Sequence, residues 1–351
     1  NIRLGFIERC LIITCKRQNT NNIFNLSSMS GNNQLTIDFN DWVYDDKERR
    51  EATSPSTIDT RTIALRQSMA QAPSPLFYIS FGSGSSGNCC YLGTRNAGIL
   101  IDAGILTETV VDTLKENGIK MENIVGICLT HDHGDHVKYA YNIVRKHKHM
   151  KVYCTNRVVN GMLRKHNISK RIKDYHSPIF KEIPFKLGDF EITAFDVPHD
   201  GDDNMGFFVR HGNKNFVVAT DLGAISERAR HYISQAHYLM IEANYDKEML
   251  IKGTYPDYLK RRIQTDRGHM DNVETAAFLS EIYTPQLKYI FLCHLSNDNN
   301  TPDIALNTIS KALRDRGLTI GTAQETIEDR KADVQLMALP RLEPTRWFVF
   351  K

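Results

Sequence analysis

Three histidines and two aspartates fall within six consecutive positions of a chain that has 13 histidines in 351 residues. The stretch reads LTHDHGDHV, from Leu129 to Val137, and it follows the apolar run NIVGIC, so its side chains are expected at the end of a strand. Imidazole and carboxylate groups are the ligands that suit zinc, manganese or iron. The spacing therefore predicts a metal site.

The spacing within this stretch further predicts two ions. Alternate positions of an extended segment point to the same side, so His131 and His133 can share one ion. After a turn at Gly134, Asp135 and His136 can reach a second ion nearby.

Four side chains cannot complete two coordination spheres, so further ligands are expected where later apolar runs end. His199 follows FDV in VPHDG, Asp221 follows VVA in VATDLG, and His294 follows IFLC in FLCHLS. Taken singly, each position is also typical of a capping or hydrogen-bonded core residue. Together, at the same edge of a sheet, they predict a ligand set.

The elements that must position these residues are strands alternating with helices. Apolar runs of strand length recur from Pro75 onward, and HGNKN at residues 211–215 indicates a hairpin. One predicted helix, TETVVDTLKENG, has Thr107 as N-cap and Gly118 as its stop, and another, TPDIALNTISKALRDRG, ends at Gly317. This alternation favours a layered structure with helices outside the sheets.

Composition bounds the class of protein. The chain is 41% hydrophobic, enough for one large globular domain with appendages. Its longest apolar runs fall well short of the roughly 20 residues that cross a bilayer, so we expect no membrane span. The seven cysteines are scattered and several lie in apolar runs, which favours reduced thiols and a cytoplasmic location.

The domain organisation follows from shifts in polarity. Residues 1–28 precede the first methionine and are interpreted as an upstream or vector-derived extension, or as a targeting peptide. Residues 29–75 are polar and indicate an arm or linker, and residues 76–351 are expected to form the folded domain. Within the arm, QLTIDF from Gln34 to Phe39 weakly resembles peptides that dock on sliding clamps; an edge strand or a disordered arm is the alternative.

Basic charge is concentrated directly after the histidine cluster. From Val137 to Lys173 there are 11 Lys or Arg residues and no Asp or Glu. A solvated helix face usually mixes signs, so this run indicates a surface for a polyanion, with Arg145, Lys146 and Lys148 as candidate contacts.

The order HxHxDH, His199, Asp221 and His294, with ILIDAG upstream, resembles the metallo-β-lactamase superfamily. The resemblance implies a four-layer αββα sandwich with a binuclear metal centre along one edge. The segments FGSGSSGNCCYLG, ILIDAG, LTHDHGDHV and CHLSNDNN are similar to the bacterial YycJ/WalJ-like exonuclease branch, over about residues 76–335.

Carried over residue by residue, the resemblance assigns the metal ligands. It implies that one ion is held by His131, His133 and His199, the other by Asp135, His136 and His294, and that Asp221 bridges the two. True β-lactamases have cysteine at the position of Asp221, which argues against antibiotic hydrolysis and fits the phosphodiesterase and thioesterase branches. Zinc is the expected metal, although the same ligands accept manganese or iron.

Further site residues are expected around this centre. Asp102 in LIDAG is expected to orient a ligand histidine through its other ring nitrogen, or else to be a strand-end carboxylate bonded to backbone. Ser85, Ser86 and Asn88 in SGSSGN could bind a phosphate, although a glycine-rich hairpin turn explains the pattern equally well. His269 could contact phosphate or protonate the leaving oxygen, and the alternative is a surface histidine. The segment GHMDN here replaces the family's GHLSN, so the resemblance leaves the role of His269 open.

These residues predict a binuclear metal-dependent phosphodiesterase in which Asp135, Asp221 and His269 act in catalysis. Nucleic acid is the favoured substrate, and the favoured activity is that of a 5′ to 3′ exonuclease on single-stranded DNA. In one alternative the same metal centre acts on a small molecule, so that the protein is a cyclic-nucleotide phosphodiesterase or a glyoxalase II-like thioesterase. Another is a non-catalytic metal-stabilised binding module, against which the complete ligand set argues.

Overall fold

A computed structural model describes residues 2–7, 10–15 and 74–350 of the chain. The chain divides into two units, Asn1–Ile63 and Ala64–Lys351. In the first unit, β1 (Ile2–Ile7) pairs with β2 (Cys10–Cys15) as an antiparallel hairpin. The proposed clamp-docking segment, residues 34–39, lies outside the described residues, and the boundaries at residues 28 and 75 stay predictions.

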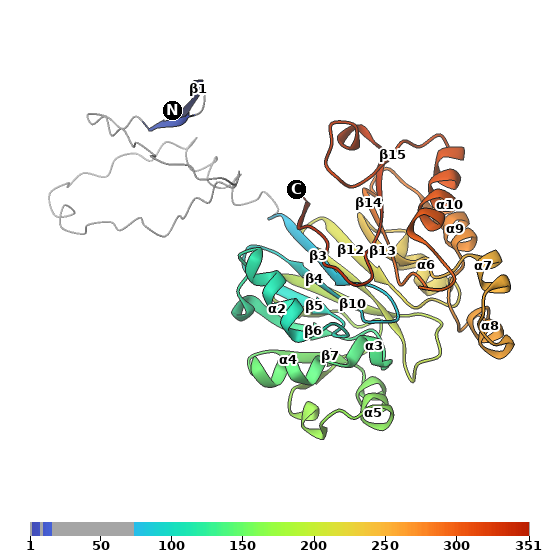
Figure 1. Cartoon of the computed structure of the whole chain (residues 1–351). Coiled ribbons are helices and arrows are strands. Elements are labelled where there is room, and N and C mark those ends of the chain that lie inside the picture. The colour runs from blue at the N-terminus through green and yellow to red at the C-terminus, as the bar shows by residue number, and fades with distance from the viewer. Residues whose placement is uncertain (1, 8–9, 16–73, 351) are drawn as a thin grey trace. The chain divides into compact units, whose positions relative to one another are not determined.

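Two β-sheets form the frame of the second unit (Figure 1). The seven-stranded sheet has the order β17-β3-β4-β5-β6-β7-β8, and the eight-stranded sheet the order β15-β16-β14-β13-β12-β11-β10-β9. The strands of the first sheet are β3 (Leu76–Gly82), β4 (Cys89–Gly93), β5 (Gly98–Ile101), β6 (Ile124–Cys128), β7 (Lys151–Cys154), β8 (His176–Pro178) and β17 (Phe348–Phe350). Those of the second are β9 (Phe185–Leu187), β10 (Phe190–Asp196), β11 (Met205–His211), β12 (Lys214–Ala219), β13 (Tyr238–Glu242), β14 (Tyr289–Cys293), β15 (Ile320–Gly321) and β16 (Val334–Ala338).

Helices cover the outer faces of both sheets. The helices are α2 (Thr107–Glu116), α3 (Gly134–Val137), α4 (Ala140–Lys146), α5 (Asn156–Lys165), α6 (Glu227–Ile233), α7 (Lys247–Lys252), α8 (Asp257–Ile263), α9 (Asn272–Ile282) and α10 (Pro302–Asp315), with 3₁₀ turns η2 (Met121–Asn123), η3 (Lys170–Asp174) and η4 (Asp329–Lys331). The residues of β12 show the layering, because side chains alternate across a strand. Phe216 and Val218 join the core that lies between the sheets, while Val217 and Ala219 pack with α6, α9 and α10. The predicted four-layer αββα sandwich is confirmed.

Local sequence signals explain most of the element ends. The predicted hairpin at HGNKN joins β11 to β12. Thr301 caps α10 by accepting from the backbone N–H of Ile304, and Gly317 beyond its end has a φ of +82°. The prediction that Thr107 caps α2 is wrong. Leu106 occupies the cap position, and the Thr107 hydroxyl is buried without a hydrogen-bond partner inside the helix's first turn.

The strands that carry the predicted ligands end at one edge of the sandwich. Strands β5 and β6 run parallel in one sheet, as do β12, β13 and β14 in the other. Their carboxyl ends therefore present the loops that follow them together, which is where parallel sheets commonly build sites. The five cysteines of the second unit are buried and free. Among the described helices, none is both long and apolar enough to cross a membrane.

Replacing Phe291 by alanine tests the packing between the sheets. The ring of Phe291 is fully buried, with its centroid 4.8 Å from that of Tyr78 and 5.1 Å from that of Phe348. We expect Phe291→Ala to lower the free energy of unfolding in urea by about 3 to 5 kcal/mol. The control Ile251→Ala, at a side chain 58% exposed, should change it by less than about 0.5 kcal/mol. Equal effects of the two variants would contradict this packing.

Candidate metal centre

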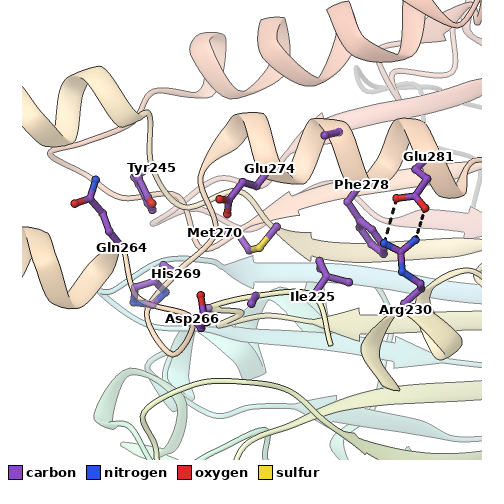
Figure 2. A pocket seen from close by; sticks show the side chains of 13 residues that line it. Ile225, Arg230, Tyr245, Gln264, Asp266, His269, Met270, Glu274, Phe278 and Glu281 are labelled. Carbon is purple, nitrogen blue, oxygen red and sulfur yellow. Dashed lines mark hydrogen bonds and ion pairs between the residues drawn. The ribbon is translucent and has the colours of Figure 1, made fainter. Parts of the chain in front are cut away.

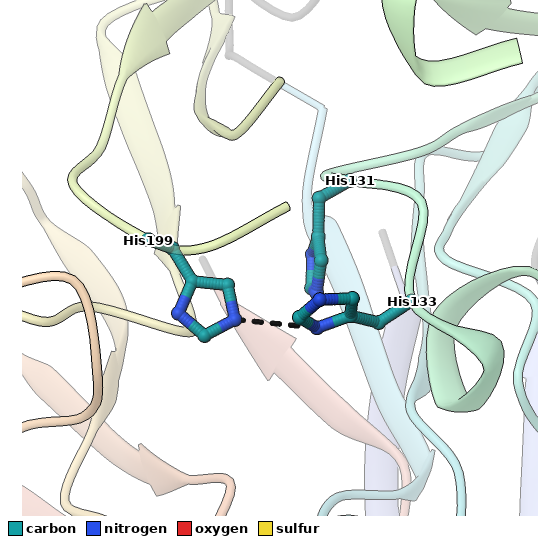
Figure 3. A group of neighbouring side chains, drawn as sticks. All are labelled: His131, His133 and His199. Carbon is teal, nitrogen blue, oxygen red and sulfur yellow. Dashed lines mark hydrogen bonds between the residues drawn. The ribbon is translucent and has the colours of Figure 1, made fainter. Parts of the chain in front are cut away.

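The structure brings the seven predicted metal ligands together at the carboxyl edge of the strands. The side chains form several overlapping groups, and within each group the possible ligand atoms, one nitrogen or oxygen per residue, lie within 4.8 Å of one another. One group is formed by His131, His133 and His199, whose imidazoles converge in Figure 3. The other groups are His131, His136 and Asp221; Asp135, His136 and His294; and Asp221, Glu242, His269 and His294.

Three residues leave their strands in a left-handed backbone conformation. Asp102 after β5, Asp221 after β12 and His294 after β14 have φ values of +61°, +53° and +53°. Such values are uncommon for residues other than glycine and cost on the order of 1–3 kcal/mol each. The surrounding contacts hold these three residues in this conformation. Backbone strain of this kind is concentrated at functional sites.

Two ligand histidines are oriented by hydrogen bonds to one ring nitrogen. The Nδ1 of His136 lies 2.8 Å from Oδ2 of Asp102, and the Nδ1 of His199 lies 2.9 Å from the carbonyl oxygen of Gly268. Each Nδ1 is thereby directed away from the cluster and each Nε2 toward it, which is the orientation of metal-binding histidines. Asp102 thus lies where the sequence placed it, beside a ligand histidine.

The separations between these atoms fit a divalent metal. Two ligands that each lie about 2.1 Å from a tetrahedral zinc ion are about 3.4 Å apart. The Nε2 of His199 lies 3.3 Å from Nδ1 of His133. On the other side of the cluster, Oδ2 of Asp135 lies 3.5 Å from Nε2 of His136 and 3.4 Å from Nε2 of His294.

Asp221 lies between the two sides of the cluster. Its Oδ2 is 3.2 Å from Nε2 of His136, and its Oδ1 is 3.6 Å from Nε2 of His199. The Nε2 of His131 is buried and has no hydrogen-bond partner, a costly arrangement for a polar atom unless it binds a ligand. The donor set and this orphan nitrogen both fit a divalent cation.

Asp221 and His133 have the charge states that bind a metal. Burial opposes ionisation of Asp221, but His294, His136 and His131 hold the pKa of its carboxyl well below the usual value. Burial, reinforced by the neighbouring His199, lowers the pKa of His133 to about 4. A carboxylate and a neutral imidazole are the forms in which these side chains bind metals.

His136 and His294, by contrast, must each lose a proton when a cation enters. Despite burial, Asp221 and Asp102 raise the pKa of His136 well above its usual value, and Asp221 and Asp135 raise the pKa of His294 to about 10.

Glu242, the last residue of β13, belongs to the site although sequence reasoning did not select it. Its side chain is fully buried, and its Oε1 accepts from Nδ1 of His269 at 2.8 Å and from Nδ1 of His294 at 2.9 Å. Burial opposes its ionisation, yet the two imidazoles hold the pKa of Glu242 below the usual value. The available signal was the one that selected Asp221 and His294, an acid directly after the apolar run of HYLMIEAN.

The glycine-rich loop lies beside the cluster, but its members differ in role. Asn88 is 2% exposed, and its Nδ2 donates to Oδ2 of Asp135 at 3.2 Å and to the carbonyl oxygen of Gly84 at 3.0 Å. Its amide therefore holds Asp135 in place, while a contact between Asn88 and substrate stays a prediction. Ser85 and Ser86 are exposed at the tip of the same loop.

Arg145, Lys146 and Lys148 lie at or just beyond the end of α4, away from the centre, and their assignment as contacts to a polyanion stays a prediction. The chain after the cluster must cross over to the start of the parallel strand β7, so the end of α4 lies at the opposite end of β6. His149 donates to the carbonyl oxygen of Ile124, the first residue of β6, whereas the cluster follows its last residue. Lys146 pairs there with Glu108 at 3.0 Å.

Another cation of the basic run does reach the centre. Lys165 at the end of α5 lies 2.8 Å from Oδ2 of Asp132, a fully buried carboxylate between two predicted ligands, and 2.9 Å from Oδ1 of Asp202. Arg164 also pairs with Asp202. These cations are partly neutralised by acids from outside the run, and they hold the ligand loop in position.

Comparison with known proteins agrees with the fold. A family model described as a beta-lactamase superfamily domain matches residues 98–291. The metallo-β-lactamase fold protein YhfI from Bacillus subtilis superimposes with a TM-score of 0.53 at 14% identity, over 79% of this chain and 99% of that one. The chain belongs to the metallo-β-lactamase superfamily and is a metal-dependent hydrolase.

Curated relatives place the chain more narrowly. It is 34% identical over 251 residues to exodeoxyribonuclease YycJ of Bacillus anthracis, covering 71% of this chain and 94% of the relative. It is 33% identical over 245 residues to exodeoxyribonuclease WalJ of Streptococcus pneumoniae strain D39, covering 70% and 90%. Within the superfamily, the chain is a YycJ/WalJ-like protein.

Asp221→Ala tests the centre through its metal content. Because the carboxylate of Asp221 lies beside residues of both ligand groups, its removal should reduce bound metal and bring hydrolysis down to background. Metal is measured by mass spectrometry after metal is added back to the metal-free protein, with Asp315→Ala, an exposed position at the end of α10, as control. Full metal content and full activity in Asp221→Ala would rule out this assignment.

Proposed function

We propose that the chain is a binuclear metal-dependent phosphodiesterase that degrades single-stranded DNA from the 5′ end. The observation that carries the two-ion interpretation is the position of Asp221, whose carboxylate lies within 3.6 Å of His199 in one ligand group and of His136 and His294 in the other. The DNA substrate is supported by the two relatives named exodeoxyribonucleases, each covered over at least 90% of its length. Zinc is the proposed metal, with manganese or iron as alternatives that the same ligands accept.

The chain's own residues support this chemistry. When bound, the ions supply hydroxide at neutral pH by lowering the pKa of water, and they neutralise charge on the phosphoryl oxygens. Asp102 and Gly268 fix the rings of His136 and His199, and Asn88 fixes the carboxylate of Asp135. These atoms are held in place before substrate arrives, so little reorganisation is needed during the reaction.

His269 is proposed as the residue that protonates the leaving oxygen. Its Nδ1 donates to the buried carboxylate of Glu242, so the proton to be transferred is carried on Nε2. The ring centroid of His269 lies 5.0 Å from that of His199 and 5.2 Å from that of His294, which places it beside the cluster. Glu242 orients the ring of His269 through this hydrogen bond, in the manner of an acid that orients a catalytic histidine.

Substrate assays with metal-loaded protein test the proposed function. End-labelled single-stranded DNA, double-stranded DNA and RNA of equal length are compared with a cyclic nucleotide and a thioester. We expect mononucleotides to be released progressively from the 5′ end of single-stranded DNA. Internal cleavage would indicate an endonuclease. Hydrolysis of only the cyclic nucleotide or the thioester would favour the small-molecule alternative and contradict the proposal.

His269→Ala tests the role of His269. We expect kcat on DNA to fall by about 10²- to 10⁴-fold with metal content unchanged. A thymidine phosphate ester of p-nitrophenol should restore most of the lost rate, because p-nitrophenolate leaves without a proton. The control His231→Ala, at an exposed position on α6, should keep full activity on both substrates. The same loss on both substrates would show that His269 is not the proton donor.

A further inference from the structure

A C-terminal segment, Leu339–Thr345, lies against the glycine-rich loop of the centre. The backbone N–H of Ser83 donates to the carbonyl oxygen of Pro340 at 3.0 Å, and the N–H of Thr345 donates to the carbonyl oxygen of Ser80 at 2.8 Å. The beta-lactamase superfamily model ends at residue 291, so this segment lies beyond the matched region. The segment places one cation, Arg341, beside the centre.

The guanidinium of Arg341 is held by neutral acceptors. Its Nη1 donates to the carbonyl oxygen of Leu295 at 3.0 Å, one residue after the ligand His294, and its Nη2 donates to Oγ of Ser86 at 2.9 Å. Within the described residues Arg341 makes no ion pair, unlike Arg346 in the same part of the chain, which pairs with Glu325 at 3.0 Å. A guanidinium has five N–H donors, so several remain available to a ligand.

The carboxylate of Asp298, on which the charge of Arg341 acts, is hydrogen-bonded to other groups. Asp298 accepts from the hydroxyl of Tyr255 at 2.8 Å and from Nδ2 of Asn297 at 3.0 Å. These two hydrogen bonds, and then the field of Arg341, hold the pKa of Asp298 below its usual value. The charge of Arg341 is therefore not cancelled by direct contact with an acid of the described residues.

The cleft that begins at His269 has the reverse charge. This cleft, of about 320 Å³, extends along α9 (Figure 2). Three carboxylates, Asp266, Glu274 and Glu281, line it with a single guanidinium, Arg230, which Glu281 already pairs at 2.7 Å. Burial and the neighbouring Asp271 raise the pKa of Glu274, which indicates local negative crowding. This cleft disfavours a second phosphate, because like charges repel.

We infer that Arg341, together with the hydroxyl of Ser86, forms a phosphate subsite that binds a backbone phosphate next to the one being cleaved. The inference rests on the proposed action on nucleic acid. A planar guanidinium fixed by two hydrogen bonds suits bidentate binding of phosphate oxygens, and Ser86 lies at the exposed tip of the loop whose Asn88 holds Asp135. The strand accordingly leaves the metal centre on the side of this loop and not along the cleft beyond His269.

Arg341→Ala in the metal-loaded enzyme tests the subsite. Kinetics on single-stranded DNA at several salt concentrations should show kcat/KM reduced about tenfold, mostly through KM, because one charge-assisted contact is lost. The slope of log(kcat/KM) against log[salt] should become shallower by about 0.7, the value for one phosphate of a single strand. Arg341→Lys keeps the charge and should lose less kcat/KM than Arg341→Ala. The control Arg346→Ala, whose thermal stability is checked in parallel, should show the same salt slope as the unmodified enzyme.

A second measurement locates the phosphate. Single methylphosphonates, which remove the charge of one linkage, are placed in turn along the oligonucleotide. One position next to the cleaved linkage should impair the unmodified enzyme about tenfold yet leave Arg341→Ala almost unaffected, because the two changes remove the same interaction.

Two outcomes would overturn the inference. One is a slope in Arg341→Ala equal to that in Arg346→Ala. The other is equal sensitivity of the two enzymes at every methylphosphonate. If the unmodified enzyme leaves all nucleic acid intact, the proposed function itself fails, and the subsite with it. If the unmodified enzyme degrades DNA as expected and the kinetics of Arg341→Ala equal those of the unmodified enzyme, only the proposed subsite is ruled out.

Discussion

The centre depends on burying one negative charge, the carboxylate of Asp221, among imidazoles. A carboxylate taken out of water is strongly disfavoured unless it is paired and hydrogen-bonded. Here the ring nitrogens of His136, His199 and His294 lie within 3.6 Å of its two oxygens. Asp221 can remain ionised only while these rings stay in place. The geometry of the strand ends is therefore constrained by this one side chain.

The same requirement extends to the residues behind the ligands. Each oriented imidazole needs an acceptor for its outer nitrogen, and the acceptors are themselves buried: Asp102 for His136, and Glu242 for His294. Glu242 also binds His269, so one carboxylate connects a metal ligand to the proposed proton donor. A change at Glu242 would consequently disturb both metal binding and proton transfer, which a metal assay alone would not separate.

Much of the fold could be predicted from the sequence because its signals are local. Alternating apolar runs and turn residues gave the strands and the layered class, and the ends of those runs selected the seven ligands that the structure brings together. Where the basic run lies relative to the cluster could not be read from the sequence, for a physical reason. Composition records that the acids are absent from residues 137–173, but a crossover connection carries the far end of α4 away from the cluster, and acids from distant segments pair with several of its cations.

The sequence by itself determined the chemistry on offer: imidazoles and carboxylates at strand ends, in a spacing that suits a divalent metal. Only the tertiary structure decided which groups meet. Glu242 joins the centre through two imidazoles, Asn88 turns inward to Asp135, and Arg341 reaches Ser86 across 255 positions of the chain. Such contacts depend on how the two sheets pack and on the C-terminal segment Leu339–Thr345 lying against the glycine-rich loop. A hydrogen bond between residues so far apart leaves no periodicity or spacing that could reveal it beforehand.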